Sequence, residues 1–393
     1  MKSLFALAIV TLVALIPFDG ASAQQVQSMK LLSAQVGWAH SGRHLYWTTD
    51  GGTHWKDIAP SQSPKQIIVD VMFLKTEMGW ALLSGGDENS DEPEFDLAST
   101  TNGGKDWLTM PVKIPDLDPK SVTLDGNGTI YFVDADHGWM NLAAVSSAAF
   151  RSSSMLMTTD GGKTWAWTPG GSGAGAGSLY FTTAMDGWVA GGPDDQHLYV
   201  THDAAKSWHE VILKTPPEVP PSDNPAFDVP IFTDPKHGSL TVTYVSTTDG
   251  QDVVILFSCD DGGYLWKVDR VVQATGPSGG QKAPATVAKS VLIIAPSSSR
   301  GTISLTTVPQ GSKASTTVAH VSKQAFAIFQ LSFSDPSHGW ASTSQGLFAT
   351  EDGGATWKSV TPSTSLGTTH PTHSSVHSTV IPTVKEIVAP VQR

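Results

Sequence analysis

The sequence is poor in cysteine, since Cys259 is the single one among 393 residues. An intramolecular disulfide is therefore excluded, and the fold has to be held together by its core. A chain of this length can bury enough apolar surface without such cross-links. The sequence also lacks any long segment in which apolar residues recur at the 3.6-residue period of a helix. This lack predicts an all-β protein.

Charge is scarce as well. Only 15% of the residues are charged, and 36 Asp and Glu outnumber 24 Lys and Arg to give a net charge of −12. Arginine is the rarest cation, at positions 43, 151, 270, 300 and 393. An acidic, arginine-poor chain argues against nucleic acid and against anionic membrane surfaces as partners.

Long apolar runs are confined to the N-terminus. Lys2, the run Leu4–Phe18 and the small-residue site Ala21-Ser22-Ala23 predict a secretory signal peptide at residues 1–23. The mature chain is then expected to be exported, either to a periplasm or out of the cell. No later run is long enough to span a bilayer, so no transmembrane segment is expected.

The sequence does contain a repeated motif, T-T-D-G-G-x-x-W, at residues 48–55. Close copies lie at 158–165 and 350–357, worn copies at 100–107 and 201–208, and a sixth at 258–266 that carries one extra residue. The Gly-Gly step accepts the left-handed backbone of a tight hairpin, and the Thr and Asp side chains can bond the backbone within the turn. The box residues predicted to hold these hairpins are Asp50, Asn102, Asp160, Asp203, Asp260, Asp352, Trp55, Trp107, Trp165, Trp208, Trp266 and Trp357.

The alternative is that these aspartates are catalytic or bind a metal ion. The same residue recurs in every unit, however, and a repeated turn needs it for its shape. We therefore assign the boxes a structural role, with no catalytic residue, cofactor site or metal site among them.

The pattern resembles the Asp-box, or BNR repeat, of bladed β-propellers. These include sialidases, sortilin-type receptors and photosystem II assembly factors of the Ycf48 type. The order D-x-x-H-G-W followed by T-D-G-G-x-T-W is most similar to the Ycf48-type repeat. That resemblance implies an assembly chaperone for a membrane protein with an arginine-rich patch, whereas this chain is acidic and has few arginines.

A second signal, a Gly-Trp step, precedes most boxes, as at Gly37-Trp38, Gly138-Trp139 and Gly339-Trp340. Each Gly-Trp step with its box predicts a unit of about four strands, the size of a propeller blade. The last interval between box tryptophans is 91 residues, about twice the others. One blade without a box is therefore expected within 289–321, giving seven blades over residues 24–362. The tail at 363–393 is expected to be extended or disordered.

Both signature turns should lie on the same face of the disc, because strands run alternately up and down. Ligand binding is then expected on the other face, where irregular loops lie. The candidate loops are 84–96, 145–154, 191–197, 215–230 and 274–284. The first is rich in Asp and Glu, which suits either a calcium site or a solvated acidic loop, and we favour the solvated loop.

The sequence contains only partial signatures of enzymes. The sialidase resemblance implies an arginine triad, and Arg43, Arg270 and the other arginines are poorly placed to supply one. Other glycosidases need facing carboxylates, and Asp70 is the main carboxylate on a predicted inner strand. The G-x-S-x-G at 276–280 lies in a linker, and His209-Glu210 starts a zinc motif that Leu213 leaves incomplete. His370, His373 and His377 would suit a metal ion only in a helix, which Pro371 disfavours.

The sequence therefore predicts an exported, non-catalytic β-propeller scaffold. It is expected to bind a protein or glycan partner on the face opposite the boxes, without a cofactor. A secreted sialidase-like glycoside hydrolase is the alternative.

Overall fold

The computed structural model describes residues 26–85, 93–115, 123–145, 152–169, 177–192, 196–247, 251–277, 285–288, 291–294, 305–309, 316–318 and 328–362. The chain divides into two compact units, residues 1–362 and 363–393. All described residues belong to the first unit. The predicted signal peptide and the predicted tail lie outside the described residues, so both stay predictions.

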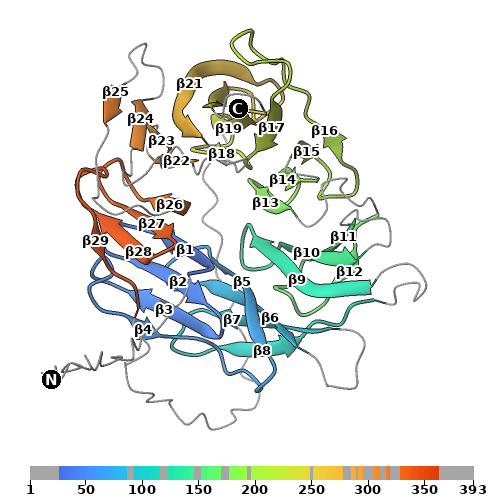
Figure 1. Cartoon of the computed structure of the whole chain (residues 1–393). Helices are drawn as coiled ribbons and strands as arrows, with labels where there is room; N and C mark the ends of the chain where they lie inside the picture. Colours follow the sequence, from blue (N-terminus) through green and yellow to red (C-terminus); the bar gives the residue numbers. More distant parts are fainter. Residues whose placement is uncertain are drawn as a thin grey trace, which may run out of the picture. The chain divides into compact units, whose positions relative to one another are not determined.

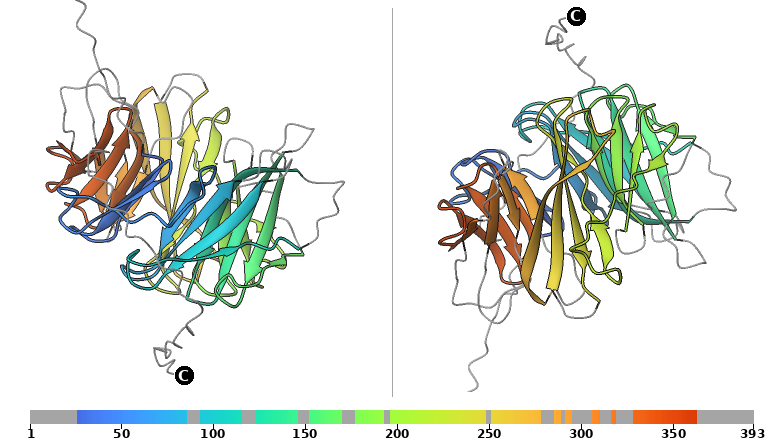
Figure 2. Two further views of the ribbon diagram at one scale, coloured as in Figure 1. Left: turned by 90° about the horizontal axis from the view of Figure 1, so that it is seen from below. Right: turned by 90° about the horizontal axis from the view of Figure 1, so that it is seen from above.

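The described residues of the first unit form β-strands and no helix, so none of them forms a helix able to cross a membrane. The strands assemble into seven antiparallel sheets, six with four strands and one with five. Each sheet is built from consecutive strands, and the sheets follow one another around a common axis (Figure 1). Figure 2 shows neighbouring sheets stacked face to face. The prediction of an all-β propeller is confirmed.

Each sheet is named after its innermost strand, which gives the β1, β5, β9, β13, β17, β22 and β26 sheets. The β17 sheet has a fifth strand, β18, which also pairs with β19. The strands of the first four sheets are β1 Ser28–Leu31, β2 Gly37–Ser41, β3 His44–Thr48 and β4 Lys56–Asp57; β5 Ile67–Phe73, β6 Gly79–Gly85, β7 Glu94–Thr100 and β8 Leu108–Pro111; β9 Thr123–Phe132, β10 Gly138–Val145, β11 Ser152–Thr158 and β12 Ala166–Trp167; and β13 Ser178–Phe181, β14 Gly187–Gly191, β15 His197–Thr201 and β16 His209–Glu210.

The strands of the other three sheets are β17 Asn224–Phe227, β18 Ile231–Phe232, β19 Gly238–Val245, β20 Gln251–Cys259 and β21 Lys267–Pro277; β22 Ala285–Ala288, β23 Val291–Ile294, β24 Leu305–Pro309 and β25 Thr316–Val318; and β26 Ile328–Phe333, β27 Gly339–Thr343, β28 Gly346–Thr350 and β29 Lys358–Ser359.

Six of the sheets have a single inner strand, whereas in the fifth sheet two short strands, β17 and β18, pair with β19, with Asp228, Val229 and Pro230 between them. Pro230 has no backbone N–H, so it cannot donate to the ladder of β19 at that point.

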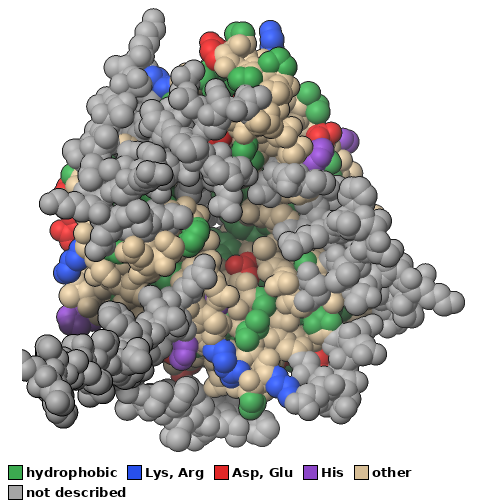
Figure 3. Space-filling view, in the orientation of Figure 1, with side chains coloured by type: hydrophobic (Ala, Val, Ile, Leu, Met, Phe, Trp, Pro, Cys, Tyr) green, Lys and Arg blue, Asp and Glu red, His purple; other side chains and the backbone are tan. Residues whose placement is uncertain are grey.

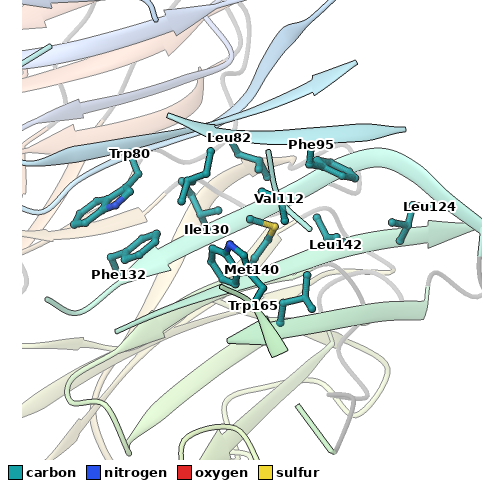
Figure 4. Close-up of a cluster of buried hydrophobic side chains, with 12 residues drawn as sticks. Trp80, Leu82, Phe95, Val112, Leu124, Ile130, Phe132, Met140, Leu142 and Trp165 are labelled. Atoms are coloured by element: carbon teal, nitrogen blue, oxygen red, sulfur yellow. The ribbon is translucent and has the colours of Figure 1, made fainter. Parts of the chain in front are cut away.

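The Gly-Trp steps stack one sheet on the next. The indole of Trp80 on β6 lies parallel to the ring of Phe132 on β9, with 4.1 Å between ring centroids. Trp139 and Phe181 repeat this stacking between the following two sheets at 3.5 Å. Figure 4 shows Trp80 and Phe132 within a cluster of buried side chains between the β5 and β9 sheets. The core is thus distributed between neighbouring sheets, as expected for units that bury their faces only against one another.

The first and last sheets are in contact, which closes the ring. The backbone N–H of Leu31 on β1 donates to Ser332 Oγ on β26 at 2.9 Å. A Cβ atom on Gly37 would lie 2.5 Å from the indole of Trp340, so the last Gly-Trp step packs directly against the first. No strand is exchanged between the first and last sheets in the described part of the chain, so side-chain contacts hold this junction.

The β22 sheet lies in the segment expected to hold a unit without a box. Three of its strands, β23, β24 and β25, lie within the predicted segment 289–321. The innermost strand, Ala285–Ala288, was not predicted. Few side chains of the β22 sheet are described. Each of the other six sheets carries a box hairpin.

Candidate functional site

The box at residues 158–165 forms a hairpin closed by its own side chains. Thr158 Oγ1 donates to Asp160 Oδ1 at 2.8 Å and accepts from the backbone N–H of Gly162 at 2.9 Å. Asp160 Oδ1 also accepts from the N–H of Thr164 at 2.9 Å, and its Oδ2 accepts from Thr164 Oγ1 at 2.6 Å. Both carboxylate oxygens are thus used within the turn.

The bond to the backbone recurs at four other predicted box positions. The side-chain oxygen of Asp50, Asn102, Asp203 and Asp352 accepts the N–H four residues later at 2.8–3.0 Å. The bonds lower the pKa of Asp50 to about 2, chiefly through the His54 N–H, and that of Asp203 to about 2, chiefly through the Ser207 hydroxyl. These carboxylates are stabilised as anions by the turn itself.

The box at 258–266 is the fifth along the chain, and its prediction is wrong by one residue. Asp261, and not Asp260, accepts the backbone N–H groups of Tyr264 and Leu265, at 3.0 and 3.1 Å. Cys259 pairs with Gly238 just as Thr48 pairs with Gly37, so Cys259 stands at the first Thr position and the box has no extra residue. Asp260 lies beside the turn, with its Oδ2 3.3 Å from Lys267 Nζ.

The error arises because Ser258 carries a hydroxyl like the first Thr of the motif. The start of the motif was therefore placed at Ser258, one residue before Cys259. Burial raises the pKa of the Cys259 thiol, which keeps it protonated. The fourth box also departs from the motif, because Ala204 and Ala205 adopt positive φ angles of 63° and 65° where the other boxes have glycine.

The box tryptophans lie at the junctions between sheets. Trp55 and Trp165 are buried, and Trp107, Trp208, Trp266 and Trp357 are half-buried. Trp107 Nε1 donates to the carbonyl of Ile58 in the preceding sheet at 2.6 Å. These contacts fit packing of the indoles between blades rather than their use as a platform for a ligand.

Each box turn is bonded to the first turn of its own sheet. In the β1 sheet, the N–H of Gly51 donates to the carbonyl of Gln35 at 2.8 Å. Equivalent bonds join Gly103 to Glu77, Gly161 to Asp136, Ala204 to Met185, Gly262 to Lys236 and Gly353 to Ser337. The two kinds of turn therefore lie together, and we call the edge that carries them the box face.

Of the loops predicted to bind a ligand, the one at 215–230 is fully described, and its residues 224–227 form strand β17. Residues 211–223, between β16 and β17, lie at the end of these strands away from the box turns. In the other predicted loops, residues 86–92, 146–151, 193–195 and 278–284 lie outside the described residues. The segment that leads into the described loop begins where the N–H of Val211 donates to the carbonyl of Leu198 at 2.8 Å. Pro216 and Val219 are buried, and the Val219 N–H donates to the Pro216 carbonyl at 3.1 Å. Ile212 is 80% exposed. This segment, residues 211–223, is thus anchored while it presents an apolar side chain.

Asp70 is the carboxylate that sequence reasoning placed near the axis. Its Oδ1 accepts the N–H of Val71 at 2.9 Å, and its Oδ2 accepts the N–H of Ile130 in the neighbouring sheet at 2.8 Å. Burial raises the pKa of this carboxyl to about 7, although both backbone bonds act to lower it. Figure 3 shows one small acidic patch, with hydrophobic side chains near it, at the centre of the face in view. Asp70 therefore joins two inner strands, with each oxygen already bonded.

The guanidinium of Arg43 is also occupied. Its Nη1 donates to the Gln66 carbonyl and its Nη2 to the Ser63 carbonyl, both at 2.8 Å. Nη1 also donates to the carbonyl of Pro64. Arg43 thus holds the loop before β5. Arg151, Arg300 and Arg393 lie outside the described residues, within which no group of three His, Cys, Asp or Glu residues is placed to hold a metal ion.

One exposed feature was missed. Met185, Tyr264 and Leu265 are 48%, 69% and 57% exposed, and all three lie in turns of the box face. The signal was present in the sequence, because the two residues before the box tryptophan are both apolar or aromatic only in the fifth box.

Comparison with solved structures gives likenesses at low identity. A structure described as "YCF48 bound to D1 peptide" is similar at 16% identity with a TM-score of 0.52, covering 84% of this chain and 94% of that chain. YCF48 from Cyanidioschyzon merolae is similar at 15% identity with a TM-score of 0.46, covering 76% and 86%. Trypanosoma rangeli sialidase with 2,3-difluorosialic acid is similar at 12% identity with a TM-score of 0.42, covering 76% and 55%.

No family model and no curated protein matches the chain. At 16% identity, the likeness to YCF48 shows a shared β-propeller fold.

Proposed function

We propose that the protein is an exported, non-catalytic β-propeller scaffold that binds a protein partner, with a glycan as the alternative partner. The observation that carries the proposal is segment 211–223, which is anchored by buried Pro216 and Val219 and presents Ile212 at 80% exposure. An apolar side chain on a pre-ordered loop loses little conformational freedom on binding. The binding face of this proposal is therefore the one opposite the box face.

The fold likeness to YCF48 supports the choice of a protein partner. That structure is described as bound to a D1 peptide, so a propeller of this fold does hold a polypeptide. By this analogy we propose an assembly-factor type of role, built on Asp-box repeats with the β22 sheet as a seventh blade. This chain is acidic and has few arginines. Its partner surface is therefore expected to differ in charge from a surface that binds an arginine-rich patch.

The occupied state of Asp70 and Arg43 favours a scaffold over the sialidase-like hydrolase. Retaining and inverting glycosidases both need two carboxyl groups that are free to act on substrate. Asp70 bonds two backbone N–H groups, and Arg43 bonds three backbone carbonyls. Purified mature protein is expected to give no turnover with a panel of fluorogenic glycosides. Turnover that Asp70→Asn abolishes would establish the hydrolase instead.

The partner-binding proposal is tested by site-specific crosslinking in the producing cells from position 212. A captured protein is then purified, and its affinity is measured for wild type and for Ile212→Ser. The expected result is a loss of about tenfold or more in affinity for this variant. Leu108→Ser is the matched control, because Leu108 is an exposed apolar residue on β8. Equal affinity of wild type and Ile212→Ser would show that segment 211–223 is not the binding site.

Export is a separate part of the proposal. The N-terminal sequence of the mature protein, recovered from the periplasm or medium, is expected to begin at Gln24. Recovery of the uncleaved chain from the cytoplasm alone would contradict it.

A further inference from the structure

The fifth box differs from the others on its exposed side. The two residues before the box tryptophan are Thr53-His54, Lys105-Asp106, Lys163-Thr164, Lys206-Ser207 and Ala355-Thr356 in the other boxes. In the fifth box they are Tyr264 and Leu265, exposed by 69% and 57%. Because Ala and Thr serve the same turn elsewhere, the hairpin does not need large apolar groups here.

Tyr264 reaches across to the neighbouring β13 sheet. Its ring stacks on the imidazole of His202, with 4.3 Å between centroids and 10° between planes. His202 Nδ1 lies 2.9 Å from Asp186 Oδ1, and Asp186 follows Met185, which is 48% exposed. We call Met185, His202, Tyr264 and Leu265 the Tyr264 patch. The stacking of Tyr264 on His202 joins its two parts, which come from two neighbouring sheets.

The backbone beneath the patch is fixed. The carbonyl of Met185 accepts the N–H of Ala204 at 3.0 Å, and Asp261 accepts the N–H groups of Tyr264 and Leu265. An aromatic side chain that is already held in place and still exposed has the properties of an interface anchor. The patch is therefore ordered before any partner arrives.

Carboxylates predominate around the patch. The four box-face segments that form and border it, residues 182–186, 201–208, 232–237 and 259–267, contain five Asp and three Lys. Of the three ammonium groups, that of Lys267 lies 3.3 Å from Asp260. Asp234, in the turn bonded to the fifth box, has its pKa lowered to about 2 by the Lys236 N–H and by His237, so it stays ionised. A partner that covers this surface is favoured if it carries positive charge.

We propose that the Tyr264 patch is a docking surface for a polypeptide segment that presents aliphatic or aromatic side chains next to Lys or Arg. The surface lies on the box face, whereas segment 211–223 lies at the opposite end of the strands. It is thus a second contact surface, and its test is independent of the first.

The test uses the mature full-length protein and short fluorescein-labelled peptides, with binding followed by fluorescence anisotropy. The probe alternates Leu and Lys; one control alternates Leu and Glu, and another alternates Ser and Lys. The Leu–Lys probe is expected to bind. The Leu–Glu and Ser–Lys peptides are each expected to bind at least about tenfold more weakly, because burial of apolar side chains and opposite charge both contribute to affinity.

The deciding variant is Met185→Ser/Tyr264→Ala/Leu265→Thr, which copies Ser337, Ala355 and Thr356 of the β26 sheet and leaves the charge unchanged. It is expected to unfold at the same temperature as wild type and to bind the probe about tenfold more weakly. If it does not fold, Tyr264→Ala alone is used, with the same expectation. Leu108→Ser, at an exposed apolar residue on β8, is expected to leave probe binding unchanged.

Three results of the peptide experiment would overturn the proposal. They are no binding of the probe by wild type, equal binding by wild type and the patch variant, and equal binding of the Ser–Lys and Leu–Lys peptides. A dimer in light scattering that the patch variant abolishes would identify a second copy of the chain as the occupant and would also overturn it.

Discussion

The indole Nε1 of Trp55 donates a hydrogen bond to the carbonyl oxygen of Val360 at 2.7 Å, which joins residues 305 positions apart. Val360 is the first residue after β29, and Ile58, the first residue after β4, accepts the same bond from Trp107. The junction between the first and last sheets therefore repeats the junction between the β1 and β5 sheets. The same kind of hydrogen bond therefore joins two consecutive sheets at Trp107 and closes the ring between the last sheet and the first at Trp55.

Trp55→Phe is expected to destabilise the protein by about 1 kcal/mol beyond its loss of packing, because a buried bond at the closure is removed. The measurement is urea unfolding of the variant and of Trp165→Phe. Trp165 is the matched control, since its indole bonds the Gly162 carbonyl of its own box at 3.1 Å. If both variants lose the same free energy of unfolding, the Trp55–Val360 bond has no special part in closure.

The corrected register of the fifth box gives a second prediction. Asp261→Ala removes the acceptor of two backbone N–H groups and is expected to cost about 1–2 kcal/mol. Asp260→Ala removes only an exposed ion pair with Lys267, for which no measurable change in the free energy of unfolding is expected. Thermal unfolding of the two variants decides between the registers, and a larger loss for Asp260→Ala would restore the original assignment.

Cys259 gives a third prediction, because it occupies the position of the first box threonine. In the third box, Thr158 donates to Asp160 and accepts from Gly162. Cys259→Thr supplies a hydroxyl with the same two partners available, Asp261 and Gly263. It is expected to stabilise the protein by about 0.5–1 kcal/mol. Thr158→Cys, the reverse change in an intact box, should destabilise it by a similar amount. A destabilised Cys259→Thr protein would show that the fifth box needs the thiol for its packing.

The repeat could be predicted from sequence because its letters specify local geometry. The Gly-Gly step, Thr158 and Asp160 define a turn by bonds within one hairpin, so the pattern indicates the turn wherever it recurs. The motif does not decide the register where two alignments of the sequence match it equally well, as at Ser258 and Cys259. They also say nothing of closure, since the Trp55–Val360 bond depends on how the sheets succeed one another around the axis.

The candidate sites were harder to predict for a different reason. The box residues were found because they repeat, whereas the Tyr264 patch is defined by a departure from the repeat at two separate turns. Only the fold shows that the turn with Met185 and the hairpin with Tyr264 lie side by side, joined through His202. Likewise, the carboxyl of Asp70 could be placed near the axis from its strand, but its two backbone donors come from β5 itself and from β9.

Asp70 makes stability depend on pH in a direction opposite to that of most carboxylates. Its pKa is raised from 3.8 to about 7 in the folded protein by burial. Between these values the folded state binds more protons than the unfolded state, so the contribution of Asp70 to the free energy of unfolding falls as pH rises. The loss is complete above about pH 7, where Asp70 is ionised in both states.

Asp70→Asn removes this titration. Its stability relative to wild type is therefore expected to rise from pH 4 to pH 7 and then to level off. Urea unfolding across this range measures the difference, with Asp260→Asn as the control, because Asp260 is an exposed carboxylate and the change removes a charge in the same way. Parallel pH profiles for wild type and Asp70→Asn would mean that Asp70 ionises in the folded protein as readily as in the unfolded chain, with water reaching the carboxyl between β5 and β9.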